Sequence, residues 1–196
     1  MFDCQFVIFA APTYLAPYMM EDAPALGGQY SPWLTANLTL ERWPVERGVA
    51  VAWDNVIYQS AGLGYVVATH QSLRTHQEKT VWTYYWALAA HTPAEGRRLL
   101  LDRDWNGWKE AILNDLTRAH PDIRECVSRI DILRMGHAMI RPVPGFLTSE
   151  ARRRIAQPNG RLVFANSDLS GISIFEEAQF RGVRAADYVL ETGGGA

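Results

Sequence analysis

A polar loop near the C-terminus carries the residue types best suited to chemistry. Residues 160–168 predict a short buried strand that ends in Asn166, Ser167 and Asp168, and residues 174–190 predict a long helix. A strand that feeds a helix through such a loop directs free backbone N–H groups and the positive end of the helix dipole at whatever binds there. Phosphates, carboxylates and electron-rich cofactor carbonyls all suit such a site.

Two predicted strands offer a second set of candidate residues. Residues 32–40 alternate, with Leu side chains on one face and Thr35 and Asn37 on the other, where they could line a cavity or simply face solvent. Residues 80–88 are bulky on both faces, which predicts a central strand. On one face the aromatic side chains could clamp an amine or a flat substrate, although aromatic residues at this spacing more often form core; they are Trp82, Tyr84 and Trp86.

Several other chemistries lack the residues they need. The five histidines and two cysteines have no zinc spacing, so no metal site is expected. There is no Gly-x-Ser-x-Gly elbow for Ser-His-Asp hydrolysis and no Gly-Lys-Ser/Thr phosphate loop. Only two lysines are present, which disfavours Schiff-base catalysis.

Composition indicates a globular chain with a substantial core. The 196 residues are 48% hydrophobic and 20% charged, and the net charge of −2 gives no reason to expect nucleic acid or an anionic membrane as partner. The apolar residues 6–16 are interrupted by prolines and lack a positive flank, so neither a signal peptide nor a membrane span is predicted. Two distant cysteines favour a reducing, cytoplasmic location.

Helix signals surround the predicted strands of the middle region. Thr92 followed by Pro93 predicts one helix start, and Asp104 predicts another, which precedes an apolar face of Trp105, Trp108, Ile112 and Leu116. We expect this helix to cover the sheet and assign it no chemical role.

The C-terminal segment resembles the flavin-dependent amine oxidoreductases, which include monoamine and polyamine oxidases and phytoene-desaturase-like enzymes. Their chains close with a strand, an Ala-Gly-x-Glu/Asp loop and a helix ending in Gly-x-Arg-Ala-Ala. The counterparts here are Phe164-Ala165, the loop residues 166–168, and residues 182–186. The N-terminal run of residues 6–12 is also similar to the family's Val-Ile-x-Ala-x-Pro segment, where the chain returns to the FAD domain.

The resemblance implies specific cofactor contacts. Asp168 would bind the ribityl and pyrophosphate part of FAD, and the loop residues Asn166 and Ser167 stand where the family usually has a glycine. Backbone N–H groups near the start of the helix would lie at the flavin ring; they belong to Ser173, Ile174 and Phe175. A family lysine is replaced by Thr35 or Asn37, which puts reaction with O₂ in doubt.

The resemblance also makes His137 the best single candidate for a polar residue of the substrate pocket. It lies in residues 130–145, which predict a strand followed by a proline-bounded extended segment. In the family the corresponding stretch returns toward the flavin. An isolated histidine is otherwise most often a core or surface residue.

The expected fold class is α+β: a mixed β-sheet substrate domain flanked by helices, plus the closing strand, loop and helix of an FAD-binding α/β domain. The N-terminal Rossmann βαβ unit is absent, since no Gly-x-Gly-x-x-Gly occurs between a strand and a helix. The implied organisation is residues 1–24 as the returning part of the FAD domain, 25–157 as the substrate domain, 158–191 as the closing part, and 192–196 as a tail.

The functional hypothesis is therefore the C-terminal portion of an FAD-dependent oxidoreductase that transfers a hydride from a small molecule, such as an amine, to flavin. Its partner would be a missing N-terminal FAD-binding half, and a homo-oligomer is also compatible with the sequence. Two alternatives stay open. The chain could be a non-catalytic domain that binds a small ligand or a protein partner, or its closing unit could be a common α/β element in which Asp168 only stabilises the fold.

Overall fold

The computed structural model describes residues 4–72, 77–158 and 160–193, and it divides the chain into two units. The terminal unit comprises residues 1–30 and 139–196, and the middle unit comprises residues 31–138. Residues 25–30 and 139–157 thus group with the chain ends, whereas the sequence analysis placed them in the substrate domain. The chain passes between the units within two strands, β2 (Gln29–Leu40) and β6 (Val127–Arg141).

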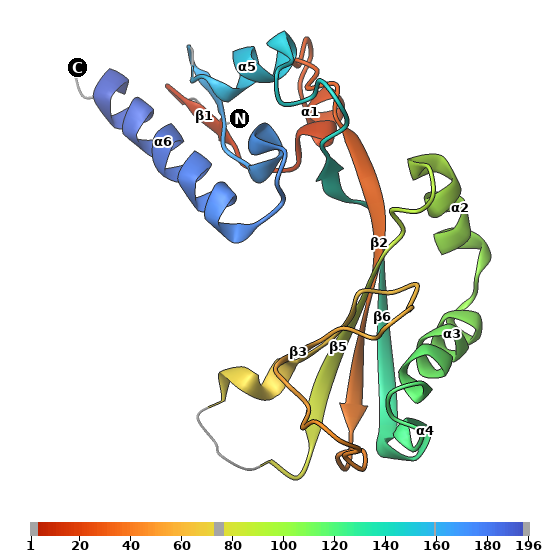
Figure 1. Ribbon diagram of the computed structural model, residues 1–196. Coiled ribbons are helices and arrows are strands. Elements are labelled where there is room, and N and C mark those ends of the chain that lie inside the picture. Colours follow the sequence, from red (N-terminus) through yellow and green to blue (C-terminus); the bar gives the residue numbers. More distant parts are fainter. Residues whose placement is uncertain (1–3, 73–76, 159, 194–196) are drawn as a thin grey trace. The chain divides into compact units, whose positions relative to one another are not determined.

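A five-stranded antiparallel sheet forms the middle unit (Figure 1). Its order is β3-β4-β5-β2-β6, with β3 at Asp54–Asn55, β4 at Gly64–Val67 and β5 at Thr80–Ala87. The central position predicted for residues 80–88 is confirmed. The expectation of a mixed sheet is wrong here, because β3, β4 and β5 follow one another along the chain and pair as antiparallel neighbours, which needs no crossover helix.

Three helices cover one face of this sheet (Figure 1): α2 (Pro93–Asp102), α3 (Trp105–Thr117) and α4 (Ile123–Cys126). Both predicted caps are confirmed. Thr92 and Glu95 form a capping box at α2, and the Asp104 side chain accepts a hydrogen bond from the Gly107 N–H at α3. These bonds satisfy N–H groups that have no partner within the helix.

The core of the middle unit follows the period-two pattern of the sequence. Leu34, Leu38 and Leu40 are completely buried, whereas Asn37 on the opposite face of β2 is exposed. The buried face packs against Trp108, Ile112 and Leu116 of α3. One face of the sheet is thus core, and the other, which we call the open sheet face, carries the alternate side chains.

The terminal unit joins the two ends of the chain in a parallel pair. β1 (Val7–Phe9) pairs with β7 (Leu162–Phe164), with Ile8 opposite Val163. The long helix α6 (Phe175–Gly193) packs against Val163 and Ala165 of one face. A second apolar cluster, built around Phe9 and Phe164, includes residues that precede β2, follow β6, and lie in α1 (Ala16–Met19) and α5 (Glu150–Ala156).

Candidate functional site

The Asp168 carboxylate is the centre of a buried hydrogen-bond cluster in the terminal unit. Asp168 is only 6% exposed. Its Oδ2 accepts hydrogen bonds from the Thr13 N–H at 2.8 Å, the Thr13 hydroxyl at 2.9 Å and the Tyr30 hydroxyl at 2.6 Å. The carboxylate therefore ties the segment after β1 and the start of β2 to the loop after β7. No hydrogen bond to the second carboxylate oxygen, Oδ1, is found among the described residues.

Tyr30 is held as a hydrogen-bond donor in this cluster. Burial, and then the hydrogen bond to Asp168, raise the pKa of Tyr30 far above its ordinary value. A phenol that stays protonated keeps donating to the carboxylate at every physiological pH. Asn166 completes the arrangement, because its Oδ1 accepts from the Asp168 N–H at 3.1 Å and its Nδ2 donates to the Ala11 carbonyl at 2.8 Å.

The loop leads directly into the exposed start of α6. Ser167–Ser170 form a 3₁₀ turn that ends at Gly171 with φ of 74°, a conformation suited to glycine. Ile174 is about half exposed and Phe175 is 75% exposed. The Ile174 N–H donates to the Ile172 carbonyl at 3.1 Å, so this predicted ring contact is engaged within the protein. The N–H groups of the first turn of α6, from Phe175 onward, have no partner within the helix and lie beside apolar side chains, although Glu176 and Glu177 add negative charge there.

The predicted loop residues differ in what they can offer a ligand. Both ends of the Asn166 amide are used within the protein, and the Ser173 hydroxyl accepts a hydrogen bond from the Ile140 N–H at 3.1 Å. The loop is further fixed by Arg152, which donates to the Leu169 carbonyl at 2.8 Å, and by Arg181, which donates to the Ser170 hydroxyl at 2.9 Å. A loop braced in this way is preorganised and needs no large rearrangement to receive a ligand.

The open sheet face of the middle unit carries Thr35 and Asn37, as predicted. The Thr83 hydroxyl donates to Asn37 Oδ1 at 2.7 Å, and the Tyr85 hydroxyl donates to Asp54 Oδ1 at 2.8 Å. Desolvation, and then the Asp54 carboxylate, raise the pKa of Tyr85 to about 12. Tyr85 is not among the residues predicted for the substrate pocket, although the alternation of side chains on β5 already put it on this face.

The aromatic residues expected in the substrate pocket lie on the other face, beneath the helices. Trp82 and Tyr84 are 0% exposed, and Trp86 packs edge-to-face on Trp108 with ring centroids 5.6 Å apart. Trp82 stacks on Tyr65 at 4.2 Å. The structure therefore gives Trp82, Tyr84 and Trp86 a packing role in place of the expected substrate contact, because the core face of a half-covered sheet is where large apolar side chains gain most from burial.

His137 is an exposed residue of β6. By alternation it shares a face with Leu133 and Met135, opposite the side on which Ile130 enters the core. Partial desolvation, and then the positive charge of Arg97, lower the pKa of His137. The imidazole is therefore biased toward its neutral form, which can accept a proton or a hydrogen bond.

The part of the chain that the structure describes contains no candidate metal site and no candidate membrane span. No cluster of three or more His, Cys, Asp or Glu side chains that could hold a metal ion is present in that part of the chain. None of the helices described there is long and apolar enough to cross a bilayer. Cys4 is an exposed free thiol and Cys126 a buried one.

Comparison with known proteins gives a likeness of fold. No protein-family model and no curated protein matches the chain. Among solved structures, the chain is similar to the protein named "Putative protoporphyrinogen oxidase" from Exiguobacterium sp. 255-15, with a TM-score of 0.63 and 10% sequence identity. The match covers 95% of this chain and 41% of that chain, so the chain spans less than half of its structural relative. At this identity, what is shown is that the chain shares the fold of part of that protein.

Proposed function

We propose that the chain is the substrate-binding and FAD-closing portion of a flavin-dependent, amine-oxidase-like oxidoreductase. One observation carries the proposal: a strand from each end of the chain pairs in parallel, and the loop that follows β7 holds a buried carboxylate and opens onto the exposed start of a long helix. This is the arrangement that the sequence resemblance implies, and the similarity to a protein named as an oxidase supports it.

The residues present fit the ribityl and ring end of FAD better than its pyrophosphate. The Oδ2 atom of Asp168 is engaged within the protein, so Oδ1 is the atom that would accept a hydrogen bond from a ribityl hydroxyl. A carboxylate cannot accept a hydrogen bond from an ionised phosphate and would repel it. The exposed side chains of Ile174 and Phe175, beside the N–H groups of the first turn of α6, suit a flat ring that is apolar with polar edges.

When bound, FAD would supply the chemistry, by accepting a hydride from the substrate. The first turn of α6 would stabilise negative charge at the edge of the reduced ring, because the positive end of the helix dipole lies there. Within the middle unit, Thr35, Asn37 and Tyr85 offer polar groups on the open sheet face to which a small molecule such as an amine would bind. His137 of the same unit, biased toward its neutral form, would accept a hydrogen bond or a proton from such a molecule.

The proposal requires a second polypeptide segment, the FAD-binding half. Parallel sheets are normally larger than two strands and covered on both faces, yet Val7 and Ile8 of β1 are 45% and 44% exposed. The sequence also lacks the Gly-x-Gly-x-x-Gly loop that holds the pyrophosphate. The side chains of Val7 and Ile8 point to opposite faces of this sheet, so strands of the FAD-binding half would extend its edges and helices of that half would cover the exposed faces, in keeping with the part of the structural relative that lies outside the match.

A flavin-binding titration with fragments of FAD tests the proposal on the chain as it stands. Because only the ribityl and ring contacts are present, riboflavin and FAD should bind with similar, weak affinity, and ADP should not compete. Asp168→Asn should weaken riboflavin binding, and Asp187→Asn, a matched change on the exposed side of α6, should not. Equal binding of ADP and FAD, or riboflavin binding that ignores the Asp168 substitution, would contradict the assignment.

A folded chain that binds no flavin in this titration would favour the non-catalytic alternative. An FAD-binding half with a Gly-x-Gly-x-x-Gly loop, encoded in the same or in a neighbouring reading frame, would instead support the enzyme. Co-expression of the two halves should then give a yellow complex, with absorbance near the flavin maxima that survives gel filtration.

A further inference from the structure

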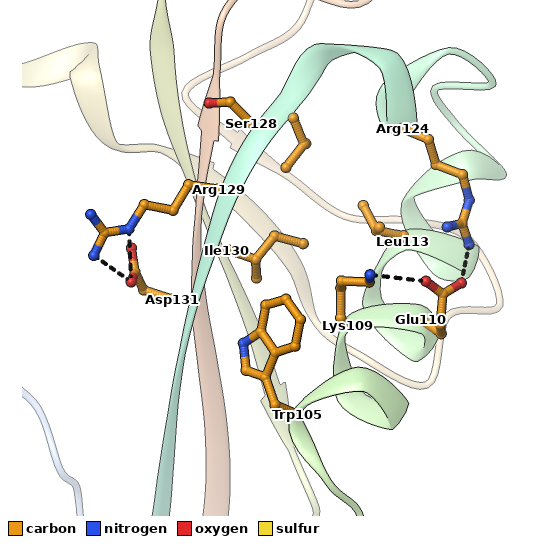
Figure 2. A pocket seen from close by; sticks show the side chains of 10 residues that line it. Trp105, Lys109, Glu110, Leu113, Arg124, Ser128, Arg129, Ile130 and Asp131 are labelled. Atoms are coloured by element: carbon orange, nitrogen blue, oxygen red, sulfur yellow. Dashed lines mark hydrogen bonds and ion pairs between the residues drawn. The ribbon is translucent and has the colours of Figure 1, made fainter.

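The outer edge of β6 is bordered by a groove in the middle unit. Among the residues that the structure describes, β6 is the last strand of the sheet, and the backbone N–H and C=O groups along its outer side have no neighbouring strand there. Between this edge and α3 lies an open groove of about 480 Å³, whose walls include Trp105, Leu113 and Ile130 (Figure 2). Trp105 is half exposed there. A long unpaired edge beside an exposed aromatic side chain is a surface on which another strand can dock.

The charges in the groove are already neutralised locally. Glu110 pairs with Arg124 at 2.8 Å and with Lys109 at 3.6 Å, and Lys109 lies 5.3 Å from the Trp105 ring. Figure 2 shows Glu110 between Lys109 on α3 and Arg124 on α4, with an ion pair to each. The groove therefore offers little to a small anion, and a protein strand with balanced charge suits it better.

The edge strand has a charge pattern that is complementary to itself. Arg129 and Asp131 lie on the same side of β6, joined at 2.7 Å, and Ile130 between them points to the other side (Figure 2). If two copies of β6 pair in antiparallel fashion about Ile130, residue 129 of one copy stands opposite residue 131 of the other. Each arginine then faces the partner's aspartate, and both ion pairs form at once, as a two-fold axis requires.

We propose that the occupant of this edge is a second copy of the chain, with β6 paired to β6 about Ile130 in one continuous sheet. The paired strands would satisfy the free backbone groups, and the half-exposed Trp105 side chains would be covered by the partner. Because a specific interface normally buries more than roughly 1,000 Å² and this one relies on a single short stretch of strand, we expect a weak dimer. The proposal is independent of the flavin assignment.

Charge reversal gives a test with an internal rescue. Arg129→Asp places two aspartates opposite two aspartates, and Asp131→Arg places two arginines opposite two arginines. Each single variant should weaken the dimer by at least about tenfold, because like charges would be juxtaposed across the axis. The double variant Arg129→Asp/Asp131→Arg should dimerise like the wild type, and an equal mixture of the two single variants should form a heterodimer.

Sedimentation velocity over a concentration series supplies the readout. Arg47→Asp and Glu46→Arg, which make the same changes of net charge on an exposed loop, should leave association unchanged. The single variants should fold, since the Arg129–Asp131 pair is largely exposed and such pairs contribute little to stability. A chain that is monomeric up to its solubility limit, or a dimer that tolerates the single reversals, would overturn the proposal; so would failure of the mixture to associate.

Discussion

Removing the Asp168 carboxylate should loosen the terminal unit and leave the middle unit intact. In Asp168→Ala the Thr13 and Tyr30 hydroxyls, 2.7 Å apart, can hydrogen-bond to each other. The Thr13 N–H cannot be rescued in this way, and Thr13 is only 4% exposed. A buried orphan donor costs about 1–3 kcal/mol, and a hydrogen bond to a charged group contributes about 1.5–3 kcal/mol. We expect a net loss of about 3 kcal/mol in the stability of this unit.

The distribution of aromatic residues allows the two units to be followed separately. All seven tryptophans lie between Trp33 and Trp108, in the middle unit, so tryptophan fluorescence reports on that unit alone. Hydrogen exchange of the peptides covering residues 5–30 and 160–175 reports on the other. A loss of about 3 kcal/mol accelerates exchange through opening by about two orders of magnitude, while the fluorescence transition in urea should stay where it is.

Asp168→Asn is the matched variant for this experiment. The amide oxygen can take the place of Oδ2 and keep all three donors, so only the charge is lost, at a cost of about 1 kcal/mol. If Asp168→Ala exchanges as slowly as the wild type in both peptides, the cluster does not hold the chain ends together. If the alanine and asparagine variants lose the same stability, charge rather than hydrogen bonding is the dominant contribution.

Three further predictions concern the middle unit. Burial lowers the pKa of His120, so its pKa in the folded protein lies below that in the unfolded chain. The free energy of unfolding should therefore be highest above the unfolded pKa and fall as the pH drops from there through the folded pKa, and the urea midpoint of His120→Gln should depend less on pH. Gly64→Ala should cost more than about 2 kcal/mol, since φ is 104° and the added Cβ would lie 1.9 Å from the Asn55 carbonyl oxygen; a near-normal melting temperature would contradict this. Thr92→Ala removes the hydroxyl that accepts from the Glu95 N–H but keeps the bond from the Thr92 backbone N–H to the Glu95 carboxylate, and it should cost about 1 kcal/mol in thermal unfolding, with Thr148→Ala as an exposed control.

Much of the fold followed from local patterns. The alternation in residues 32–40 correctly separated the Leu side chains of the core from Asn37, and the caps at Thr92 and Asp104 fixed two helix starts. The strand, loop and helix at the C-terminus were also predicted. These features depend on interactions within a few residues, which a sequence displays directly.

The candidate site could be predicted only in part. Alternation put Trp82 and Tyr84 on one face of β5, but it could not show that this is the face covered by α3. The same limit hid Tyr85, whose partner Asp54 comes from another strand. Which face of a strand is core depends on where distant helices pack, and no local pattern contains that information.

By itself, the sequence determined which residue types stand in the loop after β7 and that a helix begins just beyond it. The role of Asp168 in that loop depends on tertiary contacts, because its partners Thr13 and Tyr30 are separated from it by more than 130 residues. Folding brings the two chain ends into one parallel strand pair, and burial then makes the unsatisfied donors costly enough to hold the carboxylate in place. The cluster is thus a product of long-range packing acting on residues that the sequence lists far apart.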